Sequence, residues 1–133
     1  MNAFTCLPTF SLFAALTLCL LGCRSNSIER YKPATAIAKQ AIDTALSTWK
    51  SGAKHGPIKN GKPELNVFDA RWQAGAKLES YEILEEVAGK EYPQFKVKLK
   101  LAGKPAETTD YLAVGIDPLL VFREADYAKA SGL

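Results

Sequence analysis

Residues 95–101 read Phe-Lys-Val-Lys-Leu-Lys-Leu, and this alternation decides the fold class. Apolar side chains at every second position fall on one face of a strand, and the three lysines between them fall on the other face. The pattern therefore predicts a strand with one face buried in a core and one basic face in solvent.

The same reading extends to both sides of this strand. Residues 77–87 and 108–116 are further strand candidates, and 119–122 and 65–68 are shorter ones. Glycine and proline separate them, at Gly89-Lys90, Gly103-Lys104-Pro105 and Asp117-Pro118. Such residues are typical of turns, so the second half of the chain is predicted to be a strand meander.

One amphipathic helix is predicted upstream, over residues 33–50. Pro33 suits a first helical position, and Gly52 is a plausible stop. Between them the apolar residues recur at helical spacing and form one stripe: Ile37, Ala38, Ala41, Ile42, Ala45, Leu46 and Trp49. Residues 51–63, rich in Gly, Pro and Asn, are expected to form a loop.

A helix followed by a meander predicts an α+β fold. We expect one amphipathic helix packed on a curved antiparallel sheet of about four strands. The domain is expected to span residues 32–127, with residues 128–133 as a C-terminal tail.

The N-terminal stretch has a different character. Residues 1–22 contain no charged side chain, and residues 12–21 are almost wholly apolar. A signal peptide needs an apolar region of this length. The sequence Leu20-Leu21-Gly22-Cys23 follows, and it resembles the lipobox of bacterial lipoproteins. The resemblance implies that residues 1–22 are a signal peptide and that Cys23 carries a lipid, with residues 23–31 as lipidated cysteine and tether.

The distribution of basic residues around the apolar stretch allows alternatives to a cleaved lipoprotein signal peptide. No Lys or Arg precedes the apolar stretch, whereas Arg24, Arg30 and Lys32 follow it. On the positive-inside rule this asymmetry favours an uncleaved membrane anchor instead, and a chain that is not exported is the third alternative. If the lipobox is used, Arg24 in place of an aspartate implies sorting to the outer membrane of a Gram-negative cell rather than retention at the inner membrane.

The positions of the cysteines and the net charge restrict the disulfides and the binding partners that the domain can have. The three cysteines are Cys6, Cys19 and Cys23, so the expected domain contains none to pair in a disulfide. The net charge of +3 is too small a basic excess to indicate nucleic-acid binding. We expect membrane lipid, through acylated Cys23, and an envelope protein as partners, with the domain on the extracytoplasmic side.

The residues offer little for catalysis or metal binding. His55 is the one histidine and is expected to be a solvent-exposed loop residue, so neither a zinc site nor another cofactor is expected. An acidic run is expected to pair across strands with Lys96, Lys98 and Lys100; it consists of Glu79, Glu82, Glu85, Glu86 and Glu91.

The order of elements over residues 33–123 resembles the cystatin-like and nuclear-transport-factor-2-like α+β rolls. Enzymes with the roll fold place Asp, His or Tyr inside a conical pocket. By this resemblance the catalytic candidates are Asp69, Tyr81 and Tyr111, each of which also has a structural interpretation.

A narrower resemblance concerns residues 87–92, Val-Ala-Gly-Lys-Glu-Tyr, which are similar to the Val-Ala-Gly part of the inhibitory hairpin of cystatins. The chain departs from that pattern at Glu85-Glu86, at Pro93, and in lacking the second Pro-Trp hairpin. The expected function is therefore a membrane-anchored lipoprotein with a non-catalytic binding domain. A roll-fold enzyme or ligand pocket is the first alternative and a protease inhibitor the second.

Overall fold

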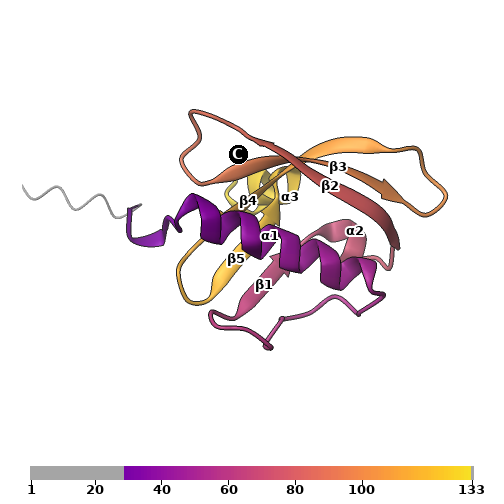
Figure 1. Cartoon of the computed structure of the whole chain (residues 1–133), viewed down its shortest axis with the longest axis horizontal. Coiled ribbons are helices and arrows are strands. Elements are labelled where there is room, and N and C mark those ends of the chain that lie inside the picture. Colours follow the sequence, from indigo (N-terminus) through magenta and orange to yellow (C-terminus); the bar gives the residue numbers. More distant parts are fainter. Residues whose placement is uncertain (1–28, 133) are drawn as a thin grey trace, which may run out of the picture.

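The computed structural model describes residues 29–132 and has an α+β fold (Figure 1). A short 3-10 helix, η1, precedes the long helix α1, and five strands and two short helices follow. Their bounds are Glu29–Tyr31 for η1, Thr35–Lys50 for α1, Leu65–Phe68 for β1, Ala70–Gln73 for α2, Leu78–Glu86 for β2, Gln94–Leu101 for β3, Glu107–Val114 for β4, Leu119–Arg123 for β5 and Glu124–Ala130 for α3. The predicted long helix and the strand at residues 95–101 are confirmed.

The sheet differs from the expected one in strand number and direction. It has five strands in the order β1-β5-β4-β3-β2 rather than about four. Strands β2 to β5 form the predicted antiparallel meander, but β1 pairs in parallel with β5, from Leu65 beside Leu119 to Phe68 beside Phe122. The sheet is therefore mixed, because the chain crosses the whole meander before returning to the side of β1.

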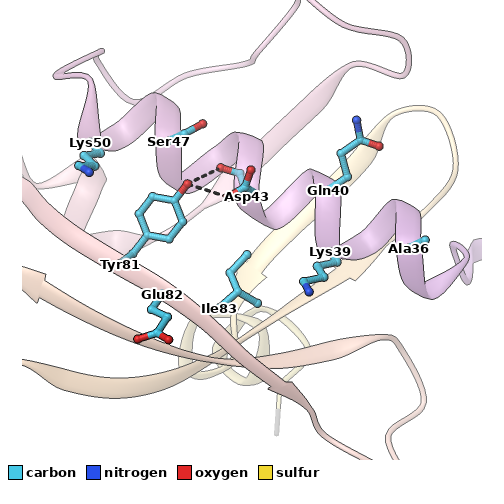
Figure 2. A pocket seen from close by; sticks show the side chains of 9 residues that line it. All are labelled: Ala36, Lys39, Gln40, Asp43, Ser47, Lys50, Tyr81, Glu82 and Ile83. Carbon is cyan, nitrogen blue, oxygen red and sulfur yellow. Dashed lines mark hydrogen bonds between the residues drawn. The ribbon is translucent and has the colours of Figure 1, made fainter.

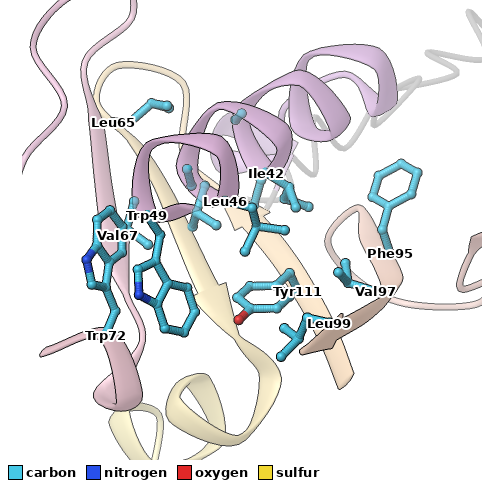
Figure 3. Close-up of a cluster of buried hydrophobic side chains, with 14 of the residues drawn as sticks. Ile42, Leu46, Trp49, Leu65, Val67, Trp72, Phe95, Val97, Leu99 and Tyr111 are labelled. Atoms are coloured by element: carbon cyan, nitrogen blue, oxygen red, sulfur yellow. The ribbon is translucent and has the colours of Figure 1, made fainter. Parts of the chain in front are cut away.

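The core lies between α1 and the sheet. The apolar stripe of α1 packs on inward side chains from all five strands, including Val97, Leu99 and Tyr111 (Figure 3). One member of the predicted stripe is an exception. Ile37, in the first turn of α1, is 45% exposed.

The other face of the sheet carries a smaller apolar layer. Phe122 stacks on Phe68 with 4.6 Å between ring centroids, and Tyr127 of α3 meets Phe122 edge-on at 5.3 Å. Helix α3 begins inside the expected domain and ends at Ala130, so it includes the first three residues of the C-terminal tail that was expected from residue 128. Its sequence carried a helix signal, since Glu124 and Asp126 lie in its first turn and Lys129 in its last, where each charge favours the helix dipole.

The turn between β4 and β5 depends on a glycine. Gly115 has φ of +91°, and a Cβ added there would lie 2.7 Å from the carbonyl oxygen of Pro118. Gly103, in the turn after β3, has a similar φ of +76° but nothing within 4 Å of such a Cβ. The two glycines therefore separate the cost of a left-handed backbone from the cost of a steric clash.

We expect Gly103→Ala to lower the free energy of unfolding by about 1–2 kcal/mol, the cost of placing a side chain in the left-handed region. Gly115→Ala should cost about 1–3 kcal/mol more, because the added methyl group must displace backbone. Urea unfolding followed by tryptophan fluorescence measures both. Equal losses for the two variants would contradict the steric role of Gly115.

Candidate functional site

Two of the three predicted catalytic candidates meet in a buried polar cluster. Asp69 follows β1 and Tyr111 lies in β4; their side chains are 2% and 1% exposed. The Tyr111 hydroxyl donates a hydrogen bond of 2.5 Å to Asp69 Oδ2. A carboxylate and a phenol at this distance could transfer a proton between them. Their surroundings decide whether the pair is catalytic or structural.

Arg71 is the third member of this cluster, and its guanidinium bonds both Asp69 and Tyr111. Its guanidinium reaches both carboxylate oxygens of Asp69 at 3.3 Å and donates to the Tyr111 hydroxyl at 3.0 Å. A further guanidinium nitrogen bonds Glu107 of β4. The carboxylate is thus neutralised by a bidentate partner, the usual way in which a buried acid is stabilised.

Local sequence explains why the cluster forms. Asp69 is the N-cap of α2, and its Oδ1 accepts the backbone N–H of Arg71 at 2.9 Å. Aspartate is among the preferred residues at this position. The prediction missed Arg71, although an aspartate after a strand with an arginine two residues on was visible in the sequence.

The pKa of Tyr111 is raised well above its ordinary value, first by burial and then by the charge and hydrogen bond of Asp69. The hydroxyl therefore remains protonated at neutral pH. Across the residues that the structure describes, every buried side-chain nitrogen and oxygen has a hydrogen-bond partner. The cluster therefore has the properties of a structural link between β1, α2 and β4.

The third candidate, Tyr81 of β2, lies apart from this cluster. Its hydroxyl donates to Asp43 Oδ1 at 2.7 Å, from β2 across to α1 (Figure 2). Burial, and then the bond to Asp43, raise the pKa of Tyr81 to about 12. This pair is accessible to solvent, unlike Asp69 and Tyr111.

The Tyr81–Asp43 pair lies within an open groove of about 710 Å³ between α1 and β2, hereafter the α1–β2 groove. Its walls combine charges of both signs with exposed apolar surface, and Figure 2 shows its side chains. They are Ala36, Lys39, Gln40, Asp43, Ser47, Lys50, Tyr81, Glu82 and Ile83. The groove therefore offers several polar groups around apolar surface, a mixture that is common at ligand-binding surfaces.

His55 lies in the predicted loop, but the expectation that it is solvent-exposed was wrong. The histidine is half-buried, its Nε2 bonds the Val67 carbonyl oxygen at 2.7 Å, and its ring meets Trp72 edge-on at 5.4 Å. The loop after α1 folds back on β1, and this contact brings His55 there. Among the described residues, no group of three His, Cys, Asp or Glu side chains could hold a metal ion.

The acidic run pairs in part as predicted. Lys100 bonds Glu79 at 2.8 Å and Lys96 bonds Glu85 at 3.4 Å, both across β2 and β3. The pairs are exposed, so each contributes little to stability. Residues 87–92, which resemble part of the cystatin hairpin, connect β2 to β3.

Cys23 and the expected signal peptide lie outside the described residues. No helix within residues 29–132 is long and apolar enough to cross a membrane. Comparison with protein-family models, with curated proteins and with solved structures gave no match.

Proposed function

We propose that this chain is an exported lipoprotein, anchored to the cell membrane or outer membrane by a lipid on Cys23. The lipobox-like sequence at residues 20–23 carries the proposal. An apolar, uncharged stretch precedes it and the polar sequence Arg24-Ser25-Asn26-Ser27 follows it. Cys23 is also the last cysteine of the chain, so no thiol within the folded domain competes for modification.

We propose further that the folded domain binds a partner and has no catalytic role. The predicted acid and phenol, Asp69 and Tyr111, are closed to solvent and neutralised by Arg71. The space between α1 and the sheet, where a roll-fold enzyme would keep its pocket, is filled by side chains such as Trp49 and Leu46 (Figure 3). Interaction surfaces such as the α1–β2 groove are therefore better candidates for binding than the interior.

We also propose the finer fold assignment, a roll like that of cystatin or of nuclear transport factor 2. It is supported by a long helix that crosses one face of an antiparallel meander. The parallel edge strand β1 lies beyond the four strands expected for this resemblance.

The test of the anchor is substitution of Cys23. Growth with radiolabelled palmitate should label the natural protein, and Cys23→Ser should remove the label completely because serine offers no thiol for the acyl-glycerol donor. Cys19→Ser, in the apolar stretch, is the matched control and should keep the label. The processed protein should begin at Cys23, and its mass should equal that of residues 23–133 plus the lipid.

Two outcomes would contradict the proposal. A natural protein without label refutes lipidation outright. A label that survives Cys23→Ser, in a protein that retains residues 1–22, would show an uncleaved anchor that is acylated elsewhere.

A further inference from the structure

One end of the domain gathers most of its exposed apolar side chains. Within residues 30–132, four large hydrophobic residues are strongly exposed, and three of them are Tyr31 at 56%, Ile37 at 45% and Ile116 at 54%. The fourth, Phe68, already stacks on Phe122. Exposed apolar residues scattered singly need no explanation, but a cluster marks an interaction surface.

The three residues lie on one continuous surface. Tyr31 of η1 accepts the backbone N–H of Gly115, which places it beside Ile116 in the β4–β5 turn. Ile116 lines a shallow depression with Lys59 and Lys62, and Ile37 lines a neighbouring one that also includes Lys62. Figure 1 shows η1, the start of α1 and the β4–β5 turn at the same end of the molecule. We call this surface the tether end, made of residues 30–32, 37, 59–62 and 116.

All four charged residues within the tether end itself are basic. Arg30 and Lys32 flank Tyr31, and Lys59 and Lys62 are exposed in the loop before β1. Asp117, which is exposed, and Glu64, which is half-buried, lie in the depression that Ile116 lines. The other acidic neighbours are Glu29 of η1 and exposed Glu86, which accepts a hydrogen bond from Thr35 in the first turn of α1. The β2–β3 turn at this end adds one charge of each sign, Lys90 and Glu91. Basic residues beside exposed Ile and Tyr side chains are the composition that binds an anionic bilayer surface.

The position of Cys23 brings this end to the bilayer. Glu29, the first described residue, follows Cys23 by only six positions. Six residues span at most about 20 Å even when fully extended. If Cys23 carries the lipid, the end of the domain that begins with η1 cannot leave the membrane surface by more than that distance.

We propose that the tether end rests on the anionic bilayer surface, with Ile37 and Ile116 at the level of the lipid head groups. This inference rests on the proposed lipidation of Cys23. The domain then stands in a fixed orientation, with the β3–β4 turn directed away from the membrane. That turn lies at the opposite end because β4 runs from residue 107 there to residue 114 beside Gly115.

A fluorescent label at each end tests the orientation. The lipid blocks the thiol of Cys23, so Ile116→Cys supplies the one free thiol of the processed protein for an environment-sensitive dye. Ala102→Cys, exposed in the β3–β4 turn, is the matched control. In vesicles of phosphatidylethanolamine and phosphatidylglycerol, emission from position 116 should shift to the blue and be quenched by nitroxide-labelled lipids. Emission from position 102 should do neither.

Charge variants test the electrostatic part. Lys59→Gln and Lys62→Gln should each lower the ratio of docked to undocked protein about five-fold, because a basic residue near an anionic surface contributes about 1 kcal/mol. Lys54→Gln and Lys104→Gln, on other exposed loops, should leave the ratio unchanged.

The possible results separate the two proposals. If mass spectrometry of the same preparation finds no lipid on Cys23, both the proposed anchor and the docking are refuted. If the lipid is present but positions 116 and 102 respond alike, only the docking is refuted. A blue shift at position 116 that is insensitive to nitroxide lipids and grows with protein concentration would show a second copy at the tether end and would equally overturn the proposal.

Discussion

Asp69→Ala should lower the free energy of unfolding by about 3–5 kcal/mol, the cost of removing one partner from a buried charge pair. The substitution leaves the Arg71 guanidinium without its bidentate carboxylate and the Tyr111 hydroxyl without its acceptor. It also removes the N-cap of α2. A domain of this size is typically stable by only about 5–15 kcal/mol, so the variant should be marginally folded at 37 °C. Urea unfolding at pH 7 measures the loss.

The pair of Asp43 and Tyr81 is the matched control. It has the same chemistry, a tyrosine hydroxyl that donates to an aspartate at 2.7 Å, but Asp43 is exposed. Asp43→Ala should cost only about 1 kcal/mol, the net contribution of a hydrogen bond that water can replace. Similar losses for the two alanine variants would show that burial and Arg71 do not strengthen the Asp69 cluster.

The pH dependence gives the cluster a second signature. Tyrosine ionises near pH 10 in an unfolded chain, whereas burial and Asp69 raise the pKa of Tyr111 in the folded state. The unfolded state therefore loses this proton first, and the stability that it contributes is present below pH 10 and declines as the pH rises above 10. Tyr111→Phe should be less stable at pH 7 but should lose less stability between pH 10 and 12. Tyr81 and Tyr92, whose pKa values are also raised, remain in both proteins and account for a residual slope. A slope unchanged by Tyr111→Phe would mean that Tyr111 titrates normally.

Local patterns were sufficient to predict the main elements. The alternation at residues 95–101 and the helical stripe from Ala38 to Trp49 follow from burial of one face, which depends only on nearby residues. The direction in which β1 joins the sheet does not depend on nearby residues, because a four-residue strand carries the same alternation whether its partner is parallel or antiparallel. The error in strand direction therefore lies in a non-local contact.

The exposure of Ile37 is another feature that the helical spacing of apolar residues could not predict. Helical spacing tells which side of α1 faces the core, but it does not tell how far along the helix the sheet extends. At its first turn α1 borders the loop at residues 60–63 instead, which leaves Ile37 nearly half exposed. The same residue then becomes part of the tether end.

The candidate site was predicted in part. The roll resemblance singled out Asp69 and Tyr111 without indicating that they touch, and it grouped them with Tyr81, which lies elsewhere. Residue type marks a side chain as able to carry chemistry, whereas its partners depend on the order of strands in the sheet. Strand β5 pairs with both β1 and β4, and this brings together two residues that are 42 positions apart in the chain. Arg71 converts the pair from a potential proton relay into a closed ion cluster, and that role depends on tertiary contact.

Trp49→Ala is expected to cost about 3–5 kcal/mol, as is typical for removal of a large buried aromatic side chain. Trp49 is 3% exposed and stacks on Trp72 with 5.6 Å between ring centroids. Its indole N–H donates to the carbonyl oxygen of Ala76 at 2.7 Å, so the variant loses a hydrogen bond as well as packing. Trp49→Phe, which keeps an aromatic ring but not the donor, should cost less than half as much.

The Trp49→Ala variant also decides between a filled interior and a natural ligand pocket. An apolar cavity left by a large side chain can bind a small aromatic molecule, so millimolar indole should raise the melting temperature of Trp49→Ala and leave that of Trp49→Phe unchanged. The natural protein should not respond, because Trp49 occupies the space between α1 and the sheet. A natural protein stabilised by indole to the same extent as the variant would reveal an interior pocket and would revive the ligand-pocket alternative. Absence of rescue in Trp49→Ala alone would instead mean that the surrounding side chains collapse into the vacated space.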